Sequence, residues 1–242
     1  MQNKFVVLGL LFSINNVQAA EGKDLTSATK ASWQGEAELG FIAARGNTNT
    51  TSINARLRVK YTVEKWEHQV KMESVRVEDN NQVKADRFST LLHSKYKYSG
   101  RSYYFGSVRY EDDPFAGYDY RTTEIIGYGR KLYRGERFKL NAEMGIGGRQ
   151  TDFIDNTSLN ESVIKLATDM QWTIGDSSSI TEELFVERGN ENTLTESTTD
   201  LKVRINNELA MKVSLSIKDN SRVLVGKKHT DTRTSITLVY DF

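Results

Sequence analysis

TDTRTSITLVYDF, residues 230–242, ends the chain with Ile236, Leu238, Tyr240 and Phe242 on one face of a predicted strand. A free apolar strand end is a liability in a soluble sheet, where edges carry charge or proline, whereas a closed barrel pairs its last strand with its first. Barrel-assembly machinery reads an aromatic carboxy terminus preceded by a second aromatic. We therefore predict the closing strand of an outer-membrane β-barrel, with Tyr240 and Phe242 as its assembly signal.

The amino terminus predicts export. Lys4 precedes an apolar run of eight residues, and the small-residue site Val17-Gln18-Ala19 follows. This pattern is typical of a secretory signal peptide, residues 1–19, followed by a polar periplasmic tail at 20–32 and a barrel at 33–242. The apolar run is shorter than the roughly 20 residues of a spanning helix, so membrane insertion is expected through strands.

Composition removes several function classes. Lys plus Arg number 33 against 32 Asp plus Glu, which gives no electrostatic case for nucleic acid. The chain has no cysteine, which removes thiol catalysis, disulfides and cysteine metal sites. No His cluster has metal-ligand spacing, so we expect neither a metal nor another cofactor.

Alternating apolar and polar residues predict about twelve antiparallel strands in an all-β, up-and-down transmembrane barrel. The clearest strand is 51–63, where Ile53, Leu57 and Tyr61 share one face while Arg56, Arg58 and Lys60 share the other. In order, the predicted strands are 33–43, 51–63, 66–74, 88–98, 104–110, 118–132, 138–148, 164–174, 180–186, 199–205, 209–217 and 230–242. The segment 180–188 is the weakest, because Glu182 interrupts its apolar face.

The predicted connections alternate in length. Tight turns are expected at 64–65, 99–102, 134–137, 175–179 and 206–207, and longer links at 78–86, 112–117, 149–159, 189–197 and 219–229, with a short link at 46–50. Short periplasmic turns and longer outward loops are typical of bacterial barrels, and both termini are then periplasmic. Pro114 lies in a predicted loop, where it removes no ladder hydrogen bond.

Aromatic residues are expected in two belts, since Tyr and Trp prefer membrane interfaces. The periplasmic belt comprises Trp33, Tyr61, Trp66, Tyr96, Tyr98, Tyr104, Phe138, Trp172, Tyr240 and Phe242. The opposite belt comprises Phe41, Phe88, Tyr110, Tyr118 and Tyr120. Alternation alone also fits a soluble β-sandwich or a lipocalin-like barrel, but these do not explain the belts or the long strands.

More specific motifs lie at Trp33-Gln34-Gly35-Glu36-Ala37-Glu38-Leu39-Gly40-Phe41, at Gly46-Asn47-Thr48-Asn49-Thr50 and at Gly117-Tyr118-Asp119-Tyr120-Arg121. With them the chain resembles the salt-induced outer-membrane protein family, from about Trp33 to Phe242. The resemblance implies a Gram-negative outer-membrane location and expression under osmotic stress. It supplies no catalytic residues.

The predicted inward face carries both signs of charge. It comprises Glu36, Glu38, Arg56, Arg58, Lys60, Glu73, Lys95, Lys97, Arg109, Arg121, Glu143, Lys165, Asp169, Asp200, Lys202, Arg204, Arg233 and Asp241. One interpretation is an interior filled by salt bridges. The other is a narrow diffusion channel, in which Arg56, Arg58 and Lys60 opposite Arg109 and Arg121 guide acidic small solutes. Gly127, Gly129, Gly145 and Gly147 also face inward and predict either close packing or a small cavity.

Enzyme functions are the alternative. His68 is predicted to face lipid, His93 to face inward and His229 to lie in the last outer loop. A lipid hydrolase needs a serine near an oriented histidine, and an aspartyl-type protease could use Asp112, Asp113 and His229. In the last loop, Arg222, Lys227 and Lys228 could bind glycolipid phosphates.

The expected function is therefore a non-enzymatic outer-membrane barrel with a structural or osmotic-stress role, or a narrow solute channel. A membrane-embedded lipid hydrolase is the rival. The expected partners of the barrel are outer-membrane lipid and glycolipid, the barrel-assembly machinery during biogenesis, and small solutes.

Overall fold

The structure, a computed structural model, describes residues 31–44 and 50–242. The described residues form twelve strands, and no helix among them is long and apolar enough to cross a membrane. The strands are β1 (Ser32–Ala44), β2 (Thr50–Val63), β3 (Trp66–Asp79), β4 (Gln82–Lys97), β5 (Ser102–Asp113), β6 (Tyr118–Arg134), β7 (Phe138–Phe153), β8 (Ser158–Thr173), β9 (Ser178–Gly189), β10 (Thr193–Arg204), β11 (Leu209–Asn220) and β12 (Thr230–Asp241). The predicted signal peptide, most of the 20–32 tail and the link at 46–49 lie outside the described residues.

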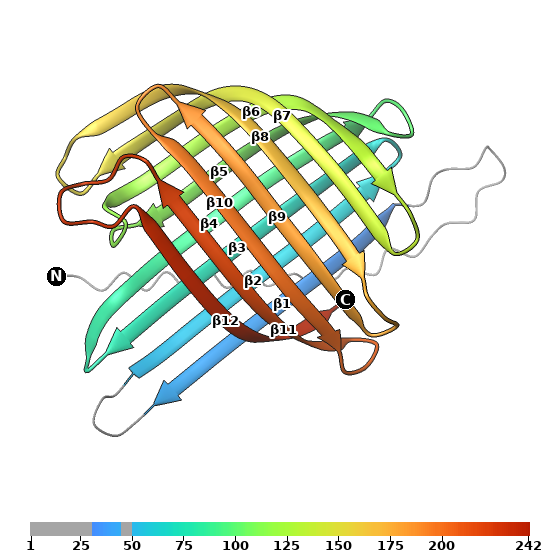
Figure 1. Ribbon diagram of the computed structural model, residues 1–242, viewed down its shortest axis with the longest axis horizontal. Coiled ribbons are helices and arrows are strands. Elements are labelled where there is room, and N and C mark those ends of the chain that lie inside the picture. The colour runs from blue at the N-terminus through green and yellow to red at the C-terminus, as the bar shows by residue number, and fades with distance from the viewer. Residues whose placement is uncertain (1–30, 45–49) are drawn as a thin grey trace, which may run out of the picture.

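The twelve strands close into one antiparallel barrel in which each strand pairs with its sequence neighbours and β12 pairs with β1 (Figure 1). The predicted fold is therefore confirmed. The closing seam is short, because β1 pairs with β12 only from Glu36 to Leu39, whereas it pairs with β2 along its whole length. Phe242 extends the seam by donating to Gly35 O at 2.9 Å and accepting from Gly35 N at 2.7 Å.

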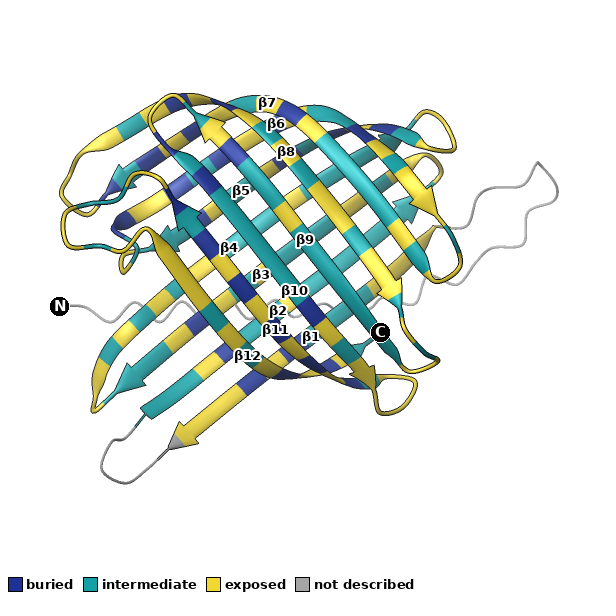
Figure 2. Cartoon of the chain, in the orientation of Figure 1, coloured by how far each residue is buried: buried dark blue, intermediate teal, exposed yellow. Residues whose placement is uncertain are grey.

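The barrel is apolar outside and charged inside. Exposed Leu, Ile, Val, Met and aromatic side chains follow the outward register of nearly every strand, and exposed and buried residues alternate along the strands (Figure 2). The buried residues include many charged side chains, among them Glu38, Glu111, Arg121, Arg149 and Lys218. A soluble barrel or sandwich has the opposite polarity, with its apolar side chains packed inside, so both soluble alternatives are wrong.

Strand boundaries agree with the predictions at one end of the barrel and differ at the other. At the end with the five tight turns, hereafter the turn end, every boundary lies within two residues of its predicted position. At the loop end several strands extend three to six residues further, as in β8, which begins at Ser158 rather than at 164. The predicted links 78–86, 149–159 and 189–197 are therefore mostly strand, while 112–117 and 219–229 remain mostly loop, and the described loops are 80–81, 114–117, 154–157, 190–192 and 221–229. In these extensions the outward side chains are polar, for example Arg76, Asp86 and Gln150, so the outward apolar pattern that predicts a strand is lost.

The clearest of these corrections is the predicted link 78–86. It is a two-residue turn of Asn80 and Asn81, whose φ angles of 49° and 62° lie in the left-handed region. Two successive left-handed residues are typical of a type I′ hairpin, and Asn is one of the residues that tolerates them. A two-residue turn allows the ladder to continue to Asp79 and Gln82.

A β-bulge corrects the placement of Tyr118. The register of β6 shifts between Tyr118 and Tyr120, so both Tyr118 and Arg121 face inward. Tyr118 is 1% exposed and accepts a hydrogen bond from Lys218 at 2.8 Å, so it does not belong to the outer aromatic belt. The extra residue of a bulge reverses the alternation, and no periodic pattern reports it.

At the turn end the predicted belt is visible as ring contacts. Trp33 lies 4.4 Å from Tyr61, Trp66 lies 5.1 Å from Tyr96 and Tyr98 lies 4.9 Å from Tyr104, measured between ring centroids. Glu182, which interrupts the outward face of β9, accepts hydrogen bonds from Ser197 at 2.6 Å and from Thr199. The hydroxyls of β10 thus satisfy this outward carboxylate.

The inward glycines of β6 and β7 permit close packing. A Cβ on Gly129 would meet the Tyr103 ring at 2.2 Å, and one on Gly127 would meet the Phe105 ring at 2.7 Å and a backbone oxygen at 2.2 Å. Tyr103 and Phe105 pack with Ile125 and Val163 in a small apolar cluster inside the lumen. Of the two predictions for these glycines, close packing is confirmed.

Candidate functional site

The three basic residues predicted to face inward from β2, namely Arg56, Arg58 and Lys60, do lie in the lumen, but the first two form ion pairs with carboxylates. Arg56 forms ion pairs with Glu73 at 3.3 Å and Glu38 at 3.5 Å. Arg58 forms one with Glu183 at 3.3 Å. Lys60 has no carboxylate within 4 Å among the described residues.

The other two candidates, Arg109 and Arg121, face the same lumen nearer the loop end. Arg109 forms an ion pair with Glu187. Arg121 donates to Asn220 at 3.1 Å and lies over the Tyr118 ring, 4.2 Å from its centroid. Their charges are thus largely engaged within the protein, and the five predicted residues do not form a free cationic path.

A dense group of side chains fills the lumen toward the loop end. This loop-end cluster consists of Arg109, Glu111, Tyr118, Arg121, Arg149, Glu161, Glu187 and Lys218. Lys218 donates to Glu111 at 2.6 Å, and Arg149 donates to Glu161 at 2.6 Å through Nη2 and 3.0 Å through Nε. Glu161 also accepts from the backbone nitrogens of Glu191 and Asn192, which ties the cluster to the β9–β10 loop.

The loop-end cluster is almost completely buried. The side chains of Arg149, Glu187 and Glu111 are 0%, 1% and 1% exposed. Charges this deeply buried are tolerated only when they are paired and hydrogen-bonded. The arrangement constricts the lumen on the side formed by β5–β11.

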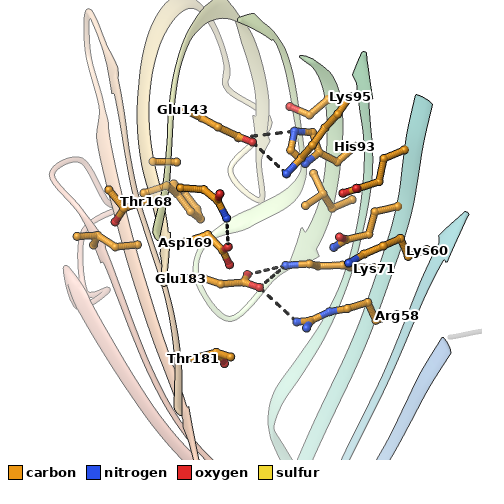
Figure 3. Close-up of a pocket in the computed structure, with 18 of the residues that line it drawn as sticks. Arg58, Lys60, Lys71, His93, Lys95, Glu143, Thr168, Asp169, Thr181 and Glu183 are labelled. Carbon is orange, nitrogen blue, oxygen red and sulfur yellow. Dashed lines mark hydrogen bonds and ion pairs between the residues drawn. The ribbon is translucent and has the colours of Figure 1, made fainter. Parts of the chain in front are cut away.

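Toward the turn end the lumen opens into a cavity of about 490 Å³, hereafter the vestibule (Figure 3). Its wall includes seven cationic side chains and four carboxylates: Arg58, Lys60, Lys71, Lys95, Arg109, Lys139 and Lys165, with Glu67, Glu143, Asp169 and Glu183. A smaller recess of about 220 Å³ adjoins it at the turn end. The recess shares Glu67, Lys95, Lys139 and Asn141 with the vestibule and adds Lys97, Lys131 and Arg134.

The carboxylates of the vestibule are already engaged. Figure 3 shows Glu183 reaching Lys71 and Arg58, at 2.5 and 3.3 Å, and Glu143 reaching Lys95 and His93, at 3.3 and 3.6 Å. Asp169 accepts from the Asn141 amide at 2.8 Å. Because cations outnumber carboxylates, the wall keeps an excess of positive charge.

A third group of charges bridges the closing seam. Lys212 on β11 reaches Glu36 and Glu38 on β1 at 2.5 and 2.7 Å, across the intervening β12. Lys202 on β10 reaches Glu36 and Asp241, each at 2.6 Å. These ion pairs support the seam where the backbone ladder is short.

Several important lumen residues were not among the sequence-predicted set. The strand extensions at the loop end contain Arg149, Glu161 and Glu187. The predicted strands 138–148 and 180–186 end before Arg149 and Glu187, and the predicted strand 164–174 begins after Glu161. Lys71 and Glu183 lie inside predicted strands, so the period of two was sufficient to place them inward. The register of β9 assigns Glu182 to the outer face and Glu183 to the lumen.

Within the described residues, none of the three histidines is contacted by both a serine hydroxyl and a carboxylate. His93 Nε2 faces Glu143, and its cross-strand neighbour Ser107 makes no hydrogen bond with it in the described structure. His68 stacks on Trp66 on the outer wall and bonds Ser94 through Nδ1 at 2.9 Å, with no carboxylate on the ring. His229 bonds the Asn220 carbonyl oxygen. Among the described residues no group of three His, Asp or Glu side chains is placed to hold a metal ion.

Two of the three basic residues proposed for glycolipid contact have partners in the protein. Arg222 forms an exposed ion pair with Glu191 at 2.8 Å, and Lys227 donates to the Phe115 carbonyl oxygen at 2.8 Å. Lys227 thereby ties the β11–β12 loop to the β5–β6 loop. Asp112 and Asp113 lie at the end of β5, where Asp113 Oδ1 accepts from the backbone nitrogen of Ala116.

Comparison with known proteins places the chain in a family and identifies its fold. Residues 37–242 match a family described as "Protein of unknown function, DUF481". The uncharacterized protein YdiY of Escherichia coli (strain K12) is 25% identical over 218 residues, covering 90% of this chain and 86% of that one.

Two solved barrels have a similar structure. The NanC porin superposes with a TM-score of 0.54 at 9% identity, covering 86% of this chain and 98% of that one. An outer membrane channel from Pseudomonas putida F1 gives 0.53 at 11% identity, covering 93% and 100%. At such low identity these similarities establish the fold alone.

Proposed function

The chain belongs to the DUF481 family, and from that premise we propose that it is an outer-membrane β-barrel that forms a narrow channel for small solutes. The apolar outer wall supports the location. A closed barrel satisfies every backbone group along paired strands, and lipid can cover the exposed apolar side chains. Outer-membrane lipid is then the partner of this wall, with the loops facing outward and the turn end facing the periplasm.

One observation carries the channel proposal, namely the unfilled space inside the charged lumen, which reaches from the vestibule toward the loop-end cluster. The vestibule occupies about 490 Å³, and a second space of about 130 Å³ lies deeper among Arg56, Arg87, Glu111 and Glu196. Barrel diameter grows with strand number, so twelve strands enclose more space than the roughly eight whose side chains just fill the interior. The loop-end cluster is then the constriction that limits conductance.

Planar-bilayer recording of the refolded protein in KCl tests this proposal. We expect small unit conductance steps from the wild type. Glu187→Ala should give larger steps, because the side chain lies in the constriction and engages Arg109 and, at 3.5 Å, Lys165. Glu191→Ala makes the same chemical change in the exposed β9–β10 loop and should leave the step size unchanged.

The same bilayer recordings can also reject the channel proposal. Absence of unit currents from both the wild type and Glu187→Ala, in samples whose heat-modifiable mobility shows a folded barrel, would leave the barrel a structural role. A role in osmotic stress is a separate part of the proposal. It predicts that deletion of the gene slows growth at high salt more than at low salt.

The rival hydrolase has weaker support. Catalysis by serine needs the hydroxyl, a histidine and an orienting group within hydrogen-bond reach of one another. Among residues 31–44 and 50–242, neither His68 nor His93 has both partners. Lyso-lipid release by the purified protein that is abolished by His93→Ala would nevertheless replace the channel proposal with the hydrolase.

A further inference from the structure

We infer that the turn-end recess binds small organic anions that carry two or more carboxylates. This inference rests on the proposed function for the role of the recess as the periplasmic mouth of a channel. Its five cationic wall residues are Lys95, Lys97, Lys131, Arg134 and Lys139, and its one carboxylate is Glu67. The kind of ligand follows from a comparison with other pairs of cations that face each other on neighbouring strands of the lumen.

Among the described residues, three pairs of cations stand directly opposite one another on neighbouring strands of the lumen. They are Arg58 and Lys71 on β2 and β3, Lys202 and Lys212 on β10 and β11, and Arg134 and Lys139 on β6 and β7. Like charges in this position repel and destabilise a sheet. Each pair therefore needs an anion between or beside its two members.

Protein carboxylates satisfy two of the three pairs. Glu183 bridges the first pair, lying 3.3 Å from Arg58 and 2.5 Å from Lys71. Glu36 bridges the second pair, lying 2.6 Å from Lys202 and 2.5 Å from Lys212. Each bridging carboxylate comes from a strand outside the pair that it serves.

The third pair has no such bridge. Within residues 31–44 and 50–242, no carboxylate lies within 4 Å of the charged nitrogens of Arg134 or Lys139, and the same is true of the neighbouring Lys131. Glu67 is engaged by Lys97 at 2.7 Å, and Lys95 is held by Glu143 and lies 4.9 Å over the Tyr103 ring. Glu67 and Glu143, the carboxylates that contact the lysines of the recess, are thus already in use.

A ligand carboxylate would fill the place that Glu183 and Glu36 fill elsewhere. A second carboxylate on the same small molecule would reach Lys131, which lies on the same strand as Arg134 and lines the same recess. Arg134 and Lys139 are exposed at the rim, so the site is open to solvent at the turn end. Charge-assisted contacts of this kind are stronger than those between neutral groups.

Calorimetric titration of the refolded barrel in an uncharged detergent, with citrate as the probe and acetate as the single-carboxylate control, tests the site. We expect citrate to bind and acetate to bind at least tenfold more weakly. The double variant Arg134→Gln/Lys139→Gln should weaken citrate binding at least tenfold. The matched control Arg130→Gln/Arg101→Gln removes two exposed cations at the same end that do not line the recess, and should change the dissociation constant less than twofold.

Lys139→Glu provides a second, independent variant. It converts the like-charge pair into an ion pair with Arg134, so it should abolish citrate binding while the barrel stays at least as resistant to unfolding as the wild type. Unchanged citrate affinity in the double variant, or an equal loss in the matched control, would overturn the site. Binding in micelles requires no conduction. Citrate binding without unit currents would therefore refute the channel and keep the site, and currents without citrate binding would do the reverse.

Discussion

Glu187 and Glu183 lie on the same strand and face the same lumen, yet they belong to two regions with different physical character. Four residues of strand separate them, about 13 Å. Glu187 is 1% exposed within the loop-end cluster, whereas Glu183 is 39% exposed in the vestibule wall. The same alternation of Arg, Lys and Glu thus builds a dry constriction in one half of the barrel and a wet, cation-rich cavity in the other.

The difference between the halves lies in how the charges are matched. In the loop-end cluster, acids and bases meet in pairs such as Arg149 with Glu161 and Lys218 with Glu111, and Arg121, which has no carboxylate within 4 Å among the described residues, is held by Asn220 and the Tyr118 ring. In the turn-end half, Lys60, Lys131, Arg134 and Lys139 have no described carboxylate partner. Matched charges exclude water and hold the loop end together, while unmatched charges leave the turn end able to attract a ligand.

The largest effect is expected from breaking the loop-end cluster. Arg149→Ala leaves Glu161 buried without its guanidinium partner, and removal of one member of a buried ion pair costs about 3–5 kcal/mol. We expect the free energy of unfolding to fall by that amount. Urea unfolding followed by the fluorescence of Trp33, Trp66 and Trp172 measures it.

An exposed ion pair of the same chemistry is the control for Arg149→Ala. Arg222 and Glu191 form a salt bridge at 2.8 Å with half-exposed side chains, and such pairs contribute about 0–1 kcal/mol. Arg222→Ala should therefore change the unfolding free energy little. Equal losses for the two variants would mean that the loop-end cluster does not stabilise the barrel more than its surface does.

An intermediate effect is expected at the seam of the turn-end half. Deletion of Phe242 removes its two backbone hydrogen bonds with Gly35 and the ring that lies over Gly35. At roughly 1 kcal/mol for each hydrogen bond, the folded barrel should lose about 2 kcal/mol. Assembly should suffer more, since the terminal aromatic is proposed as the signal for the assembly machinery, and the amount of heat-modifiable barrel in outer membranes reports it.

Phe242→Leu separates the two roles of this residue. It keeps both backbone hydrogen bonds and removes only the aromatic ring. We expect stability in vitro close to that of the wild type and a reduced yield in the membrane. A normal yield of folded protein after deletion of Phe242 would contradict the assembly signal.

These two halves also differ in how much the sequence could predict. At the turn end, apolar alternation runs up to the aromatic belt, so boundaries such as Val63 and Trp66 match the prediction. At the loop end the outward face of a strand becomes polar, so Arg149 and Glu187 lie outside the predicted strands. The inward orientation of Arg56, Arg58 and Lys60 follows from a period of two, which holds wherever the strand is regular.

Pairing across the lumen could not be predicted in the same way. Arg58 meets Glu183, 125 positions away, because strand tilt and closure set which residues face each other. The bulge at Tyr118 turns this side chain into the lumen, and the alternation of the sequence does not indicate the bulge. The excess of cations in the recess follows from these partners, and is therefore a property of the closed barrel.

The smallest effect on stability, and the sharpest test of the comparison, is expected from Glu183→Gln. The ion pairs of Glu183 with Lys71 and Arg58 are partly exposed, so their loss should cost about 0–1 kcal/mol of unfolding free energy.

The Glu183→Gln variant also adds one unit of positive charge to the vestibule and frees two cations. Because the vestibule adjoins the recess, citrate should bind about twofold to tenfold more tightly at low salt. The gain should largely vanish near 1 M salt, where the screening length is about 3 Å. Glu191→Gln makes the same change of charge in a loop and should leave citrate binding unaltered. If Glu183→Gln destabilised the barrel as strongly as Arg149→Ala, both halves of the lumen would be structural cores, and the distinction between constriction and vestibule would be lost.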